Sequence, residues 1–295
     1  MPRRAMTLIE LLVVLAILAT LIGLTLGGIQ KVRVAASVAR SHNNLRQIIL
    51  GTHQWAAANS ESTKSDILPD NNRARSMFVG GSIFYQLLPY TYGERQDLSP
   101  NSSVENIKSY YMITVPAYQD PADFTLYAGS YSTDVEHRGQ LSSYSCNMQC
   151  FTGVLTYPPR LPDGASNTLA YTQKYAVCQS RGDTSNWWML VFPQKADAKF
   201  DGTRRATVAD PGFFKDVLPL KDAATGHTVA SERGRTFQVR PSLKEADPGT
   251  ASTPYSGGLP VAMFDGSVRT LSPGIAESVY WGLFTPDGGE VPGDF

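Results

Sequence analysis

The sequence predicts an α+β protein in which a long N-terminal helix, membrane-spanning in its first half, packs on a β-rich globular domain. Residues 11–29 form an uncharged apolar run, and residues 30–58 continue it with apolar positions at helical intervals. Beyond residue 59, short segments rich in β-branched and aromatic residues alternate with Gly, Pro, Ser and Thr, which is typical of strands joined by turns.

The apolar run follows a short basic leader that contains Arg3 and Arg4. At about 1.5 Å per residue, a helix over residues 6–29 is long enough to cross a hydrocarbon layer of about 30 Å. Glu10 is the anomaly, because a carboxylate deep in lipid costs on the order of 2–3 kcal/mol and needs a partner. A cleaved secretory signal is disfavoured, since its apolar part normally spans only about 7–15 residues and ends in a small-residue exit site.

Residues 31–58 are predicted to extend the same helix as an amphipathic segment. Arg40 and Arg46 lie opposite its apolar positions, so the first half is expected in a membrane or bundle and the second half is expected to carry the globular domain. The apolar positions at helical spacing are Val34, Val38, Leu45, Ile48, Ile49 and Trp55.

The elements expected beyond the helix are short. Residues 82–92 predict a helix that stops near Pro89, because proline lacks the amide donor that a helix interior requires. Residues 241–258 are rich in Pro, Gly, Ser, Thr and acid, and predict an exposed loop. The strand candidates are residues 110–115, 168–177, 187–192 and 236–239.

Residues 261–271 predict a β-hairpin around Asp265 and Gly266, with a two-residue turn of positive φ that these residue types tolerate. The same two residues are a weak candidate ligand site. Oxygen atoms from Asp265 and Asp287 could hold calcium, although the spacing matches no defined calcium loop and the turn interpretation is favoured.

Composition and motifs disfavour several functions. The net charge is zero and 18% of the residues are charged, without a basic face, so nucleic acid is not predicted as a partner. No catalytic motif is present, and we predict no enzyme, no catalytic residues and no cofactor or metal. His42 and His53 share a helix face but lie about 16 Å apart along the axis, which is too far to bind one metal.

Three cysteines, Cys146, Cys150 and Cys178, fit no metal pattern. An exported domain could oxidise one pair and leave one thiol over. Buried free thiols are an equal alternative, because cysteine is among the most buried residue types.

The N-terminal residues, with Ala5 before Met6 and Glu10 four positions later, resemble the prepilin leader of type IV pilins and type II secretion pseudopilins. The resemblance implies that a prepilin peptidase removes residues 1–5, cuts between Ala5 and Met6 and methylates the new amine on Met6. Residues 6–30 would then form the transmembrane and assembly helix. In a bundle, Glu10 of one subunit can pair with the Met6 ammonium of its neighbour. Ala5 and Met6 depart from the family's usual Gly and Phe.

Residues 59–295 are predicted to form one extracytoplasmic domain. Six segments, in order along the chain, resemble the DUF1559 family, pilin-like exported proteins abundant in planctomycete-type bacteria. That family often carries a histidine where this chain has Tyr255, ahead of an intact Asp265 and Gly266. The six segments are residues 43–48, 88–90, 116–121, 163–169, 264–269 and 287–290.

These resemblances imply a pilin-like or pseudopilin-like exported structural protein. Its expected partners are a prepilin peptidase, the inner membrane, and copies of itself or other pilin-like subunits. It would cross the bacterial inner membrane once with its C-terminal domain in the periplasm, and after assembly it would lie at the cell surface or in an extracellular filament. The alternative is a membrane-anchored periplasmic or surface binding module, such as an adhesin, that does not polymerise.

Overall fold

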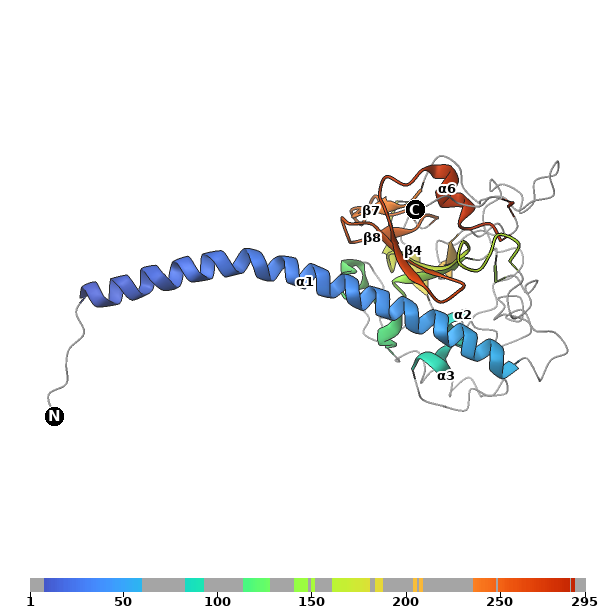
Figure 1. The fold of residues 1–295 in the computed structure, drawn as a ribbon, viewed down its shortest axis with the longest axis horizontal. Helices are drawn as coiled ribbons and strands as arrows, with labels where there is room; N and C mark the ends of the chain where they lie inside the picture. The colour runs from blue at the N-terminus through green and yellow to red at the C-terminus, as the bar shows by residue number, and fades with distance from the viewer. Residues whose placement is uncertain are drawn as a thin grey trace. The chain divides into compact units, whose positions relative to one another are not determined.

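The computed structural model (Figure 1) describes residues 8–59, 83–92, 114–127, 141–147, 150–151, 161–180, 184–187, 204–205, 207–208, 236–247, 249–286 and 288–289. It confirms the α+β class. Helix α1 (Leu8–Asn59) has 52 residues, and the strands follow it in the chain. Two compact units divide the chain, Met1–Ala39 and Arg40–Phe295, so that α1 contributes to both.

The part of α1 in the first unit is helical through an unbroken series of Leu, Ile, Val and Ala, with Gly23, Gly27 and Gly28 inside it. All side chains over residues 8–36 are exposed. The hydroxyls of Thr20 and Thr25 donate to the carbonyls three residues before them, at 2.8 and 3.1 Å. These hydroxyls are therefore satisfied by the helix itself, as suits polar groups in an apolar surrounding.

The part of α1 in the second unit has one buried face. Leu45, Ile48 and Ile49 are fully buried, and Trp55 is nearly so, whereas Arg46 is exposed. This confirms the amphipathic pattern predicted for these positions. Val34 does not belong to that face, because its side chain is 55% exposed.

A five-stranded sheet forms the centre of the second unit, in the order β10-β9-β2-β1-β6. Its pairs are antiparallel except for β1 with β6, and Cys146 of β1 lies opposite Tyr171 of β2. The strands are β1 (Tyr144–Asn147), β2 (Leu169–Gln173), β6 (Thr207–Val208), β9 (Leu259–Met263) and β10 (Val268–Leu271).

The remaining described elements are small. Strands β3 (Val177–Cys178), β4 (Thr184–Trp187) and β5 (Arg204–Arg205) form one sheet, and β7 (Gln238–Val239) pairs with β8 (Ser252–Thr253) in parallel. The short helices are α2 (Ile83–Gln86), α3 (Leu88–Thr91), η2 (Pro116–Tyr118), η3 (Phe124–Tyr127) and α6 (Glu277–Gly282).

Alternation along β9 places two cores on the two faces of the sheet. Ala262 joins a core with Leu45 and Ile48 of α1, whereas Val261 and Met263 join a core with residues of α6. Helix α1 (blue) and helix α6 (red) accordingly cover opposite faces (Figure 1). Aromatic rings fill both cores, as between Phe84 and Tyr118 (centroids 5.0 Å apart) and between Tyr280 and Trp281 (4.9 Å).

Several local predictions were wrong. The helix expected to stop near Pro89 is interrupted at Leu87, and Pro89 lies in the first turn of α3, where no amide donor is required. The strand predicted over residues 168–177 is two strands, β2 and β3. The segment 241–258 is not an exposed loop, because residues 249–253 are buried around β8.

The other strand candidates were only partly right. Thr114 and Val115 precede η2 rather than forming a strand, and β7 covers only two residues of the predicted segment 236–239. Residues 110–113 and 188–192 lie outside the described residues.

Candidate functional site

The first candidate site is the start of α1. Ala5 and Met6 lie outside the described residues, whereas Glu10 lies in the first helical turn. Its side chain is exposed, and so are those of Leu8 (79%) and Ile9 (74%) before it. A carboxylate is thus presented on an otherwise apolar helix surface, where a cation on another molecule can reach it.

The apolar surface around Glu10 is of the kind that contacts lipid or other apolar helices rather than water. Among the described residues, one helix, α1, is long and apolar enough to cross a membrane, and none of its most apolar window is buried inside the chain. Exposed apolar surface of this extent is typical of segments that contact lipid or other apolar helices. A helix is also the form that satisfies its own backbone in lipid.

The second candidate is a buried hydrogen-bond network centred on Asp120, which follows η2. Asp120 Oδ1 accepts hydrogen bonds from Tyr255 Oη (2.7 Å) and from the amide of Ala122 (2.8 Å). Asp120 Oδ2 accepts from Gln173 Nε2 (2.7 Å) and Tyr144 Oη (3.2 Å). We call Asp120, Tyr144, Gln173 and Tyr255 the Asp120 network.

The Asp120 network continues into α1. Ser41 Oγ lies 3.2 Å from Tyr144 Oη, and Asn44 Nδ2 donates to the same hydroxyl at 3.2 Å. Asn44 Nδ2 also donates to the carbonyl of Gln119 at 3.0 Å, next to Asp120. The network therefore fastens the first turns of α1 in the second unit to strands β1 and β2 and to the segment after β8.

The pKa shifts within the Asp120 network indicate a structural role. Burial raises the pKa of the Asp120 carboxyl, and hydrogen bonds from Ser41 and Tyr255 oppose that shift. Burial, with the charge of Asp120, raises the pKa of Tyr255 far above its usual value, so its hydroxyl remains a donor. A phenol held protonated beside a carboxylate stabilises the carboxylate's charge and supplies no base.

A second buried carboxylate, Asp123, lies three residues further along the chain. Its oxygens accept from Thr125 Oγ1 (2.6 Å), Ser143 Oγ (2.7 Å) and the amide of Ala176 (3.0 Å). Burial raises the pKa of this carboxyl as well, against these hydrogen bonds. Asp120 and Asp123 together attach the loop between η2 and η3 to the start of β1 and to the end of β2.

The structure brings together segments singled out in the sequence. Asn44 bonds the segment 116–121 as described above. The amides of Phe264 and Asp265 donate to the carbonyls of Thr168 (3.1 Å) and Ala165 (3.0 Å). Asp163 accepts from the amides of Gly288 (2.8 Å) and Gly289 (3.1 Å). These contacts connect five of the six segments in pairs or chains across long sequence separations.

The hairpin turn differs from the predicted one. The amide of Gly266 donates to Met263 O at 3.0 Å, and the amide of Met263 donates to Ser267 O at 2.9 Å, so the loop has three residues. Gly266 has φ 86°, whereas Asp265 is not among the residues with positive φ. These hydrogen bonds and the positive φ of Gly266 match the common three-residue hairpin loop that ends in a glycine bulge, in which only the last position requires positive φ.

Asp265 acts within this turn. Its Oδ1 accepts a hydrogen bond from the amide of Ser267 at 2.8 Å. Asp287, the other oxygen donor considered for calcium, lies outside the described residues. No group of three or more His, Cys, Asp or Glu in the described part of the chain could hold a metal ion. The contacts thus support the turn interpretation of Asp265.

The histidines of α1 also contact the hairpin. His42 Nε2 lies 2.8 Å from Thr270 Oγ1 on β10, and His53 contacts the backbone of Phe264. Burial lowers the pKa of both imidazoles. The three cysteines are buried as thiols rather than joined in a disulfide, which supports the thiol alternative over an oxidised pair.

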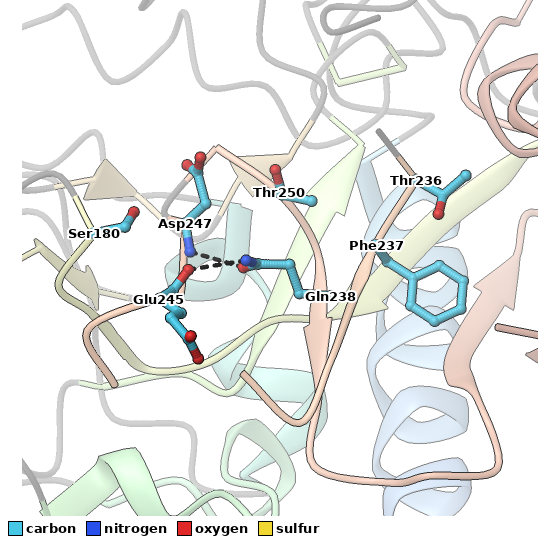
Figure 2. Close-up of a pocket in the computed structure, with 7 residues that line it drawn as sticks. All are labelled: Ser180, Thr236, Phe237, Gln238, Glu245, Asp247 and Thr250. Atoms are coloured by element: carbon cyan, nitrogen blue, oxygen red, sulfur yellow. Dashed lines mark hydrogen bonds between the residues drawn. The ribbon is translucent and has the colours of Figure 1, made fainter. Parts of the chain in front are cut away.

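A polar cavity of about 630 Å³ lies beside β7. Gln238 bridges it, donating to Glu245 O (2.9 Å) and accepting from the amide of Asp247 (2.8 Å), as Figure 2 shows. Sequence reasoning missed this cavity because it treated the segment as an exposed loop. The side-chain amide of Gln238 thus links β7 to Glu245 and Asp247. The lining residues are Ser180, Thr236, Phe237, Gln238, Glu245, Asp247 and Thr250.

Comparison with known proteins identifies the N-terminus. The family model described as the prokaryotic N-terminal methylation motif matches residues 1–26. No curated protein matches the chain, and no solved structure does. The motif indicates a pilin-like protein that prepilin peptidase processes, and with the apolar helix it indicates an exported, membrane-anchored protein. It points to a structural protein rather than an enzyme.

Proposed function

We propose that the chain is the precursor of a pilin-like or pseudopilin-like subunit that assembles into a filament or a secretion pseudopilus. Prepilin peptidase would cut between Ala5 and Met6 and methylate Met6, and α1 would hold the subunit in the inner membrane with its domain in the periplasm. One observation carries the proposal: the methylation motif over residues 1–26 continues into an exposed apolar helix that bears a single carboxylate, Glu10.

The proposed assembly step is the pairing of Glu10 with the methylated Met6 amine of the neighbouring subunit. In an apolar bundle the attraction between two opposite charges is several times stronger than in water, and each charge relieves the other's desolvation. The pair also selects one axial register, because a shifted helix would leave both charges in hydrocarbon.

The globular domain is proposed to be of the DUF1559 type. The support is that the family-like segments contact one another, as when Asn44 bonds the carbonyl of Gln119 and Asp163 bonds the amides of Gly288 and Gly289. Because the Asp120 network fastens α1 to the sheet, movement of the helix into a filament would carry the domain with it.

Substitution of Glu10 tests the assembly step. Glu10→Ala and Glu10→Gln should leave cleavage and membrane insertion intact and abolish recovery of sheared filaments from the native host. Thr20→Ala is the matched control, since the Thr20 hydroxyl donates to Ile17 O within its own helix. Equal filament yield from the Glu10 variants and the wild type would contradict the pairing. A wild-type protein that forms no filaments and no crosslinks between subunits would instead support the non-polymerising binding module.

Mass analysis of the N-terminus tests processing separately. Protein purified from native cells should begin at methylated Met6. Retention of Met1 to Ala5, or trimming beyond Ile29, would contradict the pilin route whatever the filament assay shows.

A further inference from the structure

Helix α1 carries its charges unevenly. Its one acid is Glu10, and its cations are Lys31, Arg33, Arg40 and Arg46. All four cations are exposed. Because Glu10 lies 21 positions before Lys31, α1 itself places no carboxylate near them. A helix segment with this excess of positive charge attracts an anionic surface.

The positions of Lys31 and Arg33 match the depth of a lipid headgroup layer. They follow Ile29, the end of the uncharged run, by about 3 and 6 Å along the helix axis. A headgroup layer is about 5–8 Å thick on each side of the hydrocarbon. Two positions correspond to about 200° of rotation, so the two cations lie on opposite sides of the helix. Arg40 and Arg46 lie about 16 and 25 Å beyond Ile29, outside that layer.

We propose that Lys31 and Arg33 form a phospholipid-binding collar that selects anionic headgroups around α1. This inference rests on the proposed membrane anchoring and does not depend on filament assembly. Arginine binds a phosphate group through two parallel hydrogen bonds, and lysine extends its ammonium along an apolar stem to the interface. Cleavage after Ala5 would remove Arg3 and Arg4, and the collar would then supply the side-chain cations that flank the membrane segment.

The test uses the full-length protein reconstituted in vesicles of phosphatidylcholine and phosphatidylglycerol, with spin-labelled forms of each lipid as probes. The wild type should associate with labelled phosphatidylglycerol over phosphatidylcholine by at least roughly five-fold, the ratio expected from a single cation near an anionic surface. The double variant Lys31→Gln/Arg33→Gln should lower that ratio to about one. Raising the salt concentration should lower the wild-type ratio, because salt screens the attraction.

The matched control is Arg40→Gln/Arg46→Gln, which removes the same charge beyond the headgroup layer and should keep the wild-type ratio. An unchanged ratio in the Lys31/Arg33 variant would overturn the collar, and so would an equal loss in both double variants. Resistance to alkaline extraction separates the two proposals. Protein that is extracted fails the anchoring proposal, whereas inserted protein without lipid preference fails the collar alone. Equal melting temperatures show that both variants fold.

Discussion

The two parts of α1 differ in what surrounds them, although they belong to one helix. Over residues 8–36 every side chain is exposed, whereas over residues 41–56 the helix buries one face in a core shared with β1, β2 and β9. The first part has apolar residues on all sides, and the second has them at helical intervals. The comparison teaches that the second part has its packing partners among the described residues of the domain, whereas the first part presents its apolar side chains away from the described residues.

The hydrogen bonds of polar side chains differ in the same way between the two parts of α1. Thr20 and Thr25 bond carbonyls of their own helix. In contrast, Thr52 Oγ1 lies 2.7 Å from Tyr171 Oη on β2, and His42 bonds Thr270 on β10. The polar side chains named for the first part therefore bond within their own helix. Those of the second part determine one docked position.

Introducing a carboxylate into each part of α1 should give the largest difference between the effects of two substitutions. Ile48 is fully buried, so Ile48→Asp should lower the free energy of unfolding by more than about 5 kcal/mol and abolish cooperative melting of the domain. Ile17→Asp, at an exposed position, should leave domain melting unchanged and reduce membrane insertion. Near-UV circular dichroism of the full chain in detergent measures the first effect and alkaline extraction the second. Equal melting curves for the two variants would contradict the division.

Removal of the Asp120 carboxylate should have the second-largest effect on stability. Asp120→Ala removes the acceptor of Tyr255, Gln173 and the Ala122 amide, and it should cost about 4 kcal/mol because several buried donors lose their partner. Tyr255→Phe removes one donor and should cost about 1–2 kcal/mol. Chemical denaturation measures both. A cost for Tyr255→Phe as large as that for Asp120→Ala would contradict the central role of Asp120.

Replacing one glycine of the domain and one glycine of the first part of α1 by alanine gives a further test of the difference between these regions. Gly258 has φ 132°, and a Cβ there would overlap the carbonyl oxygen of Leu271, so Gly258→Ala should cost about 3 kcal/mol. Gly27→Ala should not destabilise the domain, since a Cβ at Gly27 meets nothing within 4 Å. Thermal unfolding of both variants checks the expectation. A lower melting temperature for Gly27→Ala would show that the first part bears on domain stability.

Dependence on pH should give the smallest effect. Burial lowers the pKa of His42 and His53 in the folded state. The unfolded chain therefore binds more protons than the folded one between that lowered pKa and 6.5, and stability should fall as the pH drops from 6.5 to the folded pKa. His42→Gln/His53→Gln should flatten this slope. Burial raises the pKa of Asp120, so its contribution has the opposite sign, and stability falls as the pH rises from 3.8 through the folded pKa. An unchanged slope in the histidine variant would contradict the first expectation.

The helix was predictable from sequence because its signals are local. An uncharged apolar run and a helical period are properties of neighbouring residues, and the structure has α1 over nearly the predicted range. The hairpin was predictable for the same reason. Its loop length was not, because Phe264 is buried in the core and its amide bonds Thr168, a residue distant in sequence.

The buried polar segments could not be predicted from composition. Residues 249–253 look like a loop, yet Ser252 Oγ accepts the amide of Tyr175 at 2.8 Å and Thr253 Oγ1 donates to Gly258 O at 3.2 Å. Such satisfied hydroxyls can be buried without a large cost. The Asp120 network was hidden for another reason: Asp120 and Tyr255 are 135 positions apart, and neither has a distinctive local pattern.

The three buried thiols can report local opening of the domain, because each becomes reactive only when it is exposed. Cys146 and Cys150 belong to the core that α1 covers, whereas Cys178 packs in a separate small cluster with Tyr175 and Ala246. A maleimide reagent can modify each sulfur only when its surroundings open. The rate of alkylation at Cys146 and Cys150, compared with that at Cys178, would therefore distinguish release of the helix from opening of the small cluster around Cys178, without any introduced label.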